Sequence, residues 1–114
     1  MPRDFRLYLE DMLEAACWLR EQAATQPADR YHSDKMFRDA VIRNLEIIGE
    51  AAKHIPDEIR SLSPDTNWRG ITGLRDRAVH EYFGLHLETV RNIVNQMIPL
   101  LVSQIELLLT SLPW

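Results

Sequence analysis

The stretch LETVRNIVNQMIPLLVSQIELLLTS, residues 87–111, carries apolar side chains at intervals of three and four positions. This spacing places them on one face of an α-helix, and such a face is normally buried against other elements. Pro99 removes one backbone donor and clashes with the preceding turn, so a kink is expected there. The stretch therefore predicts a long, bent core helix whose main stripe is Leu87, Val90, Val94, Met97, Leu101, Ile105, Leu108 and Leu112.

A second apolar stripe on the same helix is formed by Ile93, Leu100 and Leu107. Two stripes exceed what the core of one small bundle needs, so the second is expected to face another subunit. The C-terminal residues 97–114 are interrupted by polar side chains and proline, and they fall short of the ~20 apolar residues that a membrane span needs. The opening MPRDFRLYLED places charges where a signal peptide is apolar. We expect a soluble cytoplasmic protein without membrane contact.

Three further helices are expected upstream, and no segment alternates with the period of a β-strand. The first covers about residues 3–25. The second follows Ser33, the candidate N-cap, and stops at Pro56. The third runs from about 67 to 83, with Gly84 as a left-handed residue after its end. A connector with one short helical turn separates the second from the third. The expected fold class is all-α, and residues 1–114 are expected to form a single domain.

Charge and composition limit the functions that this chain can have. The 114 residues are 46% hydrophobic and 26% charged, which suits a packed core, and the lone Cys17 excludes an internal disulfide. A net charge of −4 argues against strong non-specific binding of nucleic acid. Between residues 66 and 80, however, there are three arginines and only one acidic residue, Asp76. Any anion site is therefore local, with Arg77 as a supporting phosphate contact.

The sequence LRDRAVHEYFG, residues 74–84, gathers the groups with the clearest chemistry. Histidine, with a pKa near ~6.5, transfers protons in either direction at neutral pH, and arginine grips phosphate oxygens. His80 as base and Arg75 as cation suffice for metal-free RNA cleavage, because the ribose 2′-OH supplies the nucleophile. No metal or cofactor is required. The plainer interpretation, a solvated helix face with weak ion pairs, also fits these residues.

Helical geometry complicates this chemistry. At 100° per residue, Arg75 and His80 lie about 140° apart around the helix, whereas Arg75 and Tyr82 share a face. Asp76 is one turn from His80 and is placed to orient its imidazole. Arg75 and His80 converge only if the helix is distorted or if a two-fold axis joins two copies. Glu46 and Glu50 are either surface residues or partners of an arginine in the third helix.

The pattern Arg75-Asp76-x-x-x-His80-x-Tyr82 resembles the motif of HEPN-domain ribonucleases, and in particular that of HepT toxins. The resemblance extends to RNLEIIGEAAKHIP at 43–56, to Trp68 ahead of the glycines, and to the leucine-rich helix that follows. It covers about residues 5 to 110. The resemblance implies a four- to five-helix bundle of HEPN type that forms a homodimer, with the motif residues of both copies lining one cleft.

The same resemblance implies a function for the motif residues. Arg75 and His80 would be catalytic in a metal-independent endoribonuclease toxin of a type VII toxin–antitoxin system, with Asp76 as the polar residue after the arginine. The implied partner is a minimal nucleotidyltransferase antitoxin that AMPylates Tyr82 and so neutralises the nuclease. The alternative is a non-catalytic HEPN module that binds nucleotides or proteins beside a nucleotidyltransferase. In that case Arg75 and His80 would hold a phosphate without cutting RNA.

Overall fold

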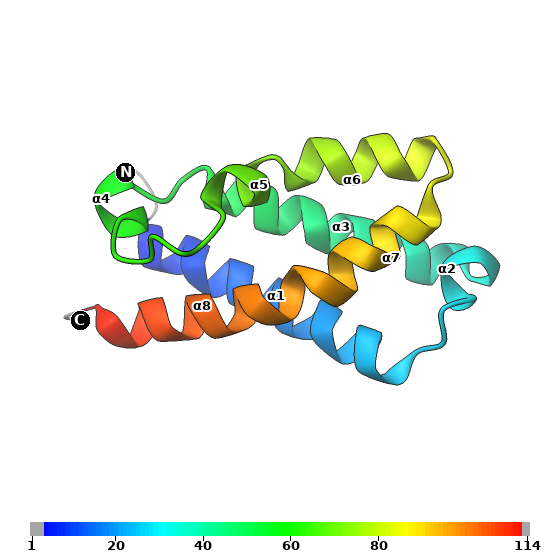
Figure 1. The fold of residues 1–114 in the computed structure, drawn as a ribbon, viewed down its shortest axis with the longest axis horizontal. Helices are drawn as coiled ribbons and strands as arrows, with labels where there is room; N and C mark the ends of the chain where they lie inside the picture. Colours follow the sequence, from blue (N-terminus) through cyan, green and yellow to red (C-terminus); the bar gives the residue numbers. More distant parts are fainter. Residues whose placement is uncertain (1–3, 113–114) are drawn as a thin grey trace.

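The computed structural model describes residues 4–112, in which every regular element is a helix (Figure 1). The longer helices are α1 (Phe5–Thr25), α3 (Lys35–Ala52), α6 (Leu74–Phe83), α7 (Leu87–Gln96) and α8 (Ile98–Ser111). Short helices lie in the connections: α2 (Arg30–Ser33), α4 (Asp57–Arg60) and α5 (Trp68–Thr72). The all-α prediction is confirmed. The expected start of the first helix at residue 3 lies outside the described residues.

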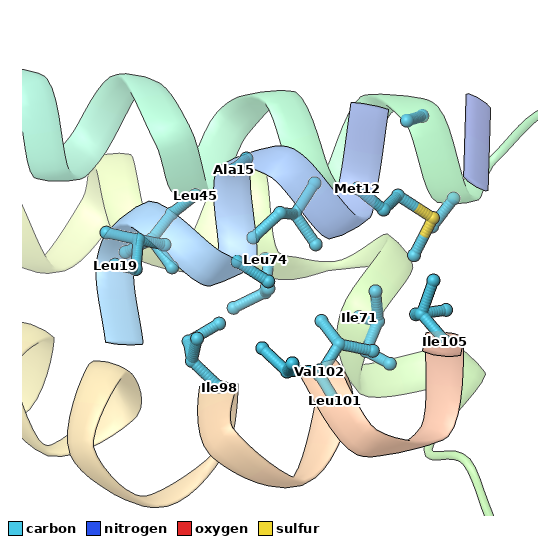
Figure 2. Packing of buried hydrophobic residues seen from close by; sticks show 14 of the residues in the cluster. Met12, Ala15, Leu19, Leu45, Ile71, Leu74, Ile98, Leu101, Val102 and Ile105 are labelled. Atoms are coloured by element: carbon cyan, nitrogen blue, oxygen red, sulfur yellow. The ribbon is translucent and has the colours of Figure 1, made fainter. Parts of the chain in front are cut away.

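The core forms where α1, α3, α6 and α8 meet, and Figure 2 shows the side chains that fill it. Leu19 of α1, Leu45 of α3, Leu74 of α6 and Ile105 of α8 are fully buried. Each such side chain contributes about 1.5–3 kcal/mol relative to an exposed one. The helical periodicity of the sequence identified these faces because it reports which side of each helix is apolar.

The predicted bend in the C-terminal helix is confirmed, and it divides the helix into α7 and α8 at Met97. Pro99 lies in the first turn of α8, where a residue without an N–H loses no helical hydrogen bond. Together the two helices span Leu87–Ser111, which is long and apolar enough to cross a membrane by length and composition. This span is longer than residues 97–114, for which too few apolar residues were expected, because α7 adds its own apolar face. The buried side chains of both helices pack against α1, as those of a core helix do.

The second apolar stripe is only partly available to a partner. Ile93 is buried within its own chain, which contradicts its assignment to that stripe. Leu100 and Leu107 are 60% and 68% exposed on α8. An apolar surface of two leucines therefore remains on the outer side of α8.

Three predicted helix ends are wrong in detail. Asp34, not Ser33, is the N-cap of α3, and its carboxylate accepts a hydrogen bond from the Phe37 N–H at 3.1 Å. The helix expected over 67–83 is two helices, since α5 ends at Thr72 and α6 begins at Leu74. Gly84 has φ −78°, and the left-handed residue is Leu85 with φ 63°.

The end of α6 is a Schellman motif shifted one residue from the expected position. The His86 N–H donates to the Glu81 carbonyl at 2.8 Å, and the Leu85 N–H donates to the Tyr82 carbonyl at 3.0 Å. This pair of bonds places the left-handed residue at Leu85, one position after the glycine. A non-glycine residue in this conformation costs about 1–2 kcal/mol. The two hydrogen bonds offset part of that cost.

Helices α3 and α6 come close together at Gly49, beside the start of α6. A Cβ atom on Gly49 would lie 2.9 Å from the Arg75 backbone nitrogen and 3.3 Å from the Ile71 carbonyl oxygen. Real Cβ atoms essentially never come within 3.0 Å of another heavy atom, and 3.3 Å is tighter than most of their contacts. Gly49 therefore allows the backbone of α6 to rest directly on α3.

We expect Gly49→Ala to push α6 away from α3 and to destabilise the protein by about 1–3 kcal/mol, as overpacking does. Urea denaturation followed by circular dichroism measures this change. Gly73→Ala is the matched control, because a Cβ there meets nothing nearer than 3.5 Å. If Gly49→Ala unfolds at the same urea concentration as Gly73→Ala, the close approach does not support the fold.

Candidate functional site

Helix α6 presents the predicted site residues on its solvent side. Leu74 and Ala78 are buried and attach the helix to the core, whereas Arg75, Asp76, Arg77 and His80 are exposed. The helix is continuous over Leu74–Phe83, so its backbone does not bend between Arg75 and His80. Distortion of α6, one of the two routes by which these side chains were expected to converge, is therefore absent.

The Arg75 guanidinium lies among carboxylates. Its Nη1 donates to Asp76 Oδ1 at 3.1 Å, and its Nε is 3.8 Å from Glu46 Oε2. These carboxylates raise the pKa of Arg75, Asp76 most strongly and Glu46 and Glu50 less. The side chain is 47% exposed, so water screens these pairs and a phosphate oxygen can replace a carboxylate.

The roles left open for Glu46 and Glu50 differ in the structure. Glu46 of α3 reaches the predicted arginine, as one of the two interpretations proposed. Glu50 instead pairs with Lys53 of its own helix at 3.1 Å and acts on Arg75 only from a distance. One turn of α3 therefore separates a direct partner of Arg75 from an indirect one.

The imidazole of His80 is exposed and has no hydrogen bond or ion pair to any described residue. Asp76 does not orient it, because the Asp76 carboxylate is engaged by its neighbour Arg75. The expected Asp76–His80 contact is thus not formed. Two of the other histidines differ: His54 stacks on Tyr8 with ring centroids 4.4 Å apart, and His86 pairs with Glu81 at 2.8 Å. The imidazole of His32 is exposed like that of His80 and likewise has no hydrogen bond or ion pair to a described residue.

Tyr82 lies half-buried on the flank of α6 that faces α3. Its hydroxyl donates to Oδ1 of Asp39, and Oδ2 of the same carboxylate pairs with Lys35. The ring packs at right angles to Phe83, with centroids 5.3 Å apart. The Tyr82 ring is thus packed, and its hydroxyl has a carboxylate partner.

Asp39 and Lys35 are the site residues that sequence reasoning missed. Asp39 lies 43 positions before Tyr82, and nothing in the spacing links them. The only local signal is the pair of opposite charges four residues apart on α3. Lys35, and then the Tyr82 hydroxyl, hold the pKa of the Asp39 carboxyl below its usual value. A shallow pocket of about 190 Å³ opens beside the Tyr82–Asp39 contact, between α3 and α6.

Arg77 points to the opposite flank, toward α7. It lines a hollow of about 290 Å³ together with Thr89, Asn92, Ile93, Gln96 and Met97. Helix α6 thus separates two environments, with Arg75 and Tyr82 on the α3 side and Arg77 on the α7 side. Within residues 4–112, no three His, Cys, Asp or Glu side chains cluster as metal ligands do.

A helical bundle that exposes an Arg-Asp-x-x-x-His-x-Tyr sequence on one helix is of the HEPN type. The family model described as "Ribonuclease HepT-like" matches residues 12–108, and this chain belongs to that family. No solved structure gives a significant match.

Relatives with ribonuclease names support the family assignment. A protein of Thermococcus cleftensis, named probable ribonuclease HepT, is 38% identical over 106 residues, which are 93% of this chain and 96% of that protein. Other relatives carry provisional RNase names. One from Methanocaldococcus jannaschii is 36% identical over 93% of this chain and 88% of its own length. One from Caldanaerobacter subterraneus is 35% identical over 89% and 90%.

The lowered pKa of Asp39 leads to a pH-dependent contribution to stability. A carboxyl whose pKa falls on folding stabilises the folded state above its unfolded value, about 3.9, and loses this effect as the pH drops through the folded value. We expect Asp39→Asn to lower the melting temperature at pH 7, with the gap to wild type closing below about pH 4. Asp65→Asn should change little at any pH, because this carboxylate is exposed and forms no ion pair with another residue of 4–112. If the difference in melting temperature between Asp39→Asn and wild type stays constant down to pH 3, the Asp39 carboxylate does not stabilise the fold in this way.

Proposed function

We propose that this protein is a metal-independent endoribonuclease that cleaves RNA with Arg75 and His80. The observation that carries the proposal is the exposed pair on α6: a guanidinium in exchangeable ion pairs, and an imidazole that no side chain in the described part of the chain engages. Membership of the HepT-like ribonuclease family supports RNA as the substrate. We also propose that residues 1–114 act as one HEPN-like domain in the cytoplasm.

In this mechanism His80 takes the proton from a ribose 2′-OH, and the resulting oxygen attacks the adjacent phosphorus. The bond to the 5′-oxygen of the next nucleotide breaks, leaving a 2′,3′-cyclic phosphate, and the departing oxygen takes up a proton from water. Arg75 exchanges its carboxylate partner for the equatorial phosphate oxygens, where negative charge increases in the transition state. Asp76 acts through Arg75, since it holds the guanidinium when substrate is absent. Arg77 supplies a second phosphate contact.

The positions of Arg75 and His80 favour a homodimer with a shared site. The undistorted α6 directs the two side chains to different sides, about 140° apart. A two-fold axis near α6 would bring Arg75 of one protomer to His80 of its partner. Exposed Leu100 and Leu107 on α8 provide apolar surface that association would cover.

We further propose that a minimal nucleotidyltransferase is the antitoxin of this protein, in a type VII system, and that it AMPylates Tyr82. The Tyr82 hydroxyl borders a shallow pocket, so a second enzyme can approach it from solvent. Transfer of AMP would replace the bond to Asp39 with a bulky, negatively charged phosphodiester. Arg75 lies seven residues earlier on the same helical face, where the new phosphate would compete with RNA for its charge.

We expect Arg75→Ala or His80→Ala to reduce RNA cleavage in EDTA by about 10²–10⁴-fold, because each removes one group that acts in the transition state. Gel analysis of a labelled single-stranded RNA measures the rate, and circular dichroism confirms the fold. His32→Ala, an exposed histidine on α2, is the matched control. RNA binding without cleavage by the wild type would instead support the non-catalytic module.

The shared site leads to a separate expectation for mixed protomers. When Arg75→Ala and His80→Ala chains are unfolded together and refolded as a mixture, half of the dimers contain one chain of each kind. Each mixed dimer then has one intact pair, so activity should return to about a quarter of the wild-type value. Light scattering measures the mass of the assembly. An active monomer, or a mixture as inactive as its components, would contradict the shared site.

For Tyr82, we expect co-expression with the proposed nucleotidyltransferase partner to add AMP to this residue and to abolish cleavage. Intact-mass spectrometry with peptide mapping locates the adduct. Tyr82→Phe should remain unmodified and active, because it lacks the acceptor oxygen. An adduct on Tyr8 or Tyr31, or full neutralisation of Tyr82→Phe, would show that Tyr82 is not the switch.

A further inference from the structure

The hollow between α6 and α7 contains polar side chains that the proposed cleavage chemistry does not use. Thr89, Asn92 and Gln96 lie at intervals of three and four on α7, so they follow one edge of that helix toward Arg77. Ile93 is buried and Met97 half-buried, and together they supply the apolar part of the lining. The volume, about 290 Å³, is close to the lower end for small-molecule sites.

The charge of this hollow differs from that of the whole protein. Its lining contains one cation, Arg77, and no carboxylate, although the chain carries 17 acidic and 13 basic side chains. The nearby Glu88 and Arg91 of α7 neutralise each other at 3.0 Å, and Glu81 is held by His86. The side chains of Arg77, Thr89, Asn92 and Gln96 form no hydrogen bond or ion pair within the described part of the chain. Their donors and acceptors face solvent and are available to a ligand.

The hollow between α6 and α7 lies beside the part of α6 that carries His80. Arg77 and His80 are three residues apart on α6, so they lie on adjacent parts of the helix surface, about 60° apart. Arg75 lies on the other flank, against Glu46. A strand of RNA with its reacting 2′-OH at His80 would therefore pass the α7 side of the helix next.

We propose that this hollow binds a nucleotide of the RNA next to the cleaved phosphate and makes cleavage base-selective. Arg77 would contact the neighbouring phosphate. The carboxamides of Asn92 and Gln96 would pair with the base edge, because each offers a donor and an acceptor, as base edges do. Ile93 and Met97 would contact the apolar face of the base. This subsite rests on the proposed ribonuclease function and extends it from the reaction to the choice of substrate.

The test compares the double variant Asn92→Ala/Gln96→Ala with Asn95→Ala. Asn95 is an exposed asparagine on the same helix that does not line the hollow. Cleavage sites in a random-sequence single-stranded RNA are mapped by sequencing. We expect wild type and Asn95→Ala to favour one base at a fixed position beside the cut. The double variant should lose this preference, with kcat/KM on the favoured sequence reduced about 5- to 100-fold. Arg77→Ala should weaken all sequences equally.

A binding measurement separates failure of the subsite from failure of the nuclease. The probe is a fluorescent RNA with 2′-O-methyl groups, which cannot be cut, followed by anisotropy. If wild type does not cut RNA but binds this probe more tightly than the double variant does, the binding subsite is supported and the proposed nuclease activity is overturned. If wild type cuts RNA and the double variant keeps the same preference and affinity, the subsite is overturned and the nuclease stands. If neither cutting nor binding occurs, both proposals are overturned.

Discussion

The contact between the Gly49 backbone and the start of α6 is the constraint on which the rest of the site depends. Because α3 has no Cβ there, α6 lies against it at backbone distance. The two helices then run side by side (Figure 1), so that their side chains meet in pairs. Arg75 meets Glu46 near one end, and Tyr82 meets Asp39 near the other. A side chain at position 49 would change both pairs together, although they lie about two turns apart along α6.

This arrangement gives α6 two unlike flanks and explains how an acidic protein can present a surface to a polyanion. The flank toward α3 is lined by carboxylates, which hold the cation and the tyrosine in place. The flank toward α7 is lined by amides, a hydroxyl and one arginine. Negative charge therefore holds Arg75 and Tyr82 on one side, while the other side has no carboxylate in its lining to repel a phosphate. Net charge averages over these two faces and so says little about where a nucleic acid would bind.

The features that depend on local periodicity could be predicted from the sequence. The features that depend on contacts between distant residues could not. Helical spacing identified the buried faces of the helices, and the Pro99 bend followed from a missing N–H. The helix ends were less accurate, because Ser33 and Asp34 both suit an N-cap and Gly84 precedes the true left-handed residue. The motif residues of α6 could be found from their order along the chain. Asp39 could not, because no sequence rule links residues 43 positions apart, and the hollow at Arg77 depends on how α7 packs.

The leucine at the end of α6 has a consequence for the register of the whole helix. Leu85 occupies a left-handed conformation while 78% exposed, so its side chain gains little from burial there. The preceding residue, Gly84, would adopt this conformation without cost. The chain thus contains two adjacent stop positions, and the one it uses is the intrinsically less favourable. Because the chain stops at Leu85, the helical turn extends through Phe83, and Tyr82 within that turn donates its hydroxyl hydrogen to Asp39 of α3. The unfavourable backbone conformation therefore lies three residues beyond the tyrosine that joins the end of α6 to α3.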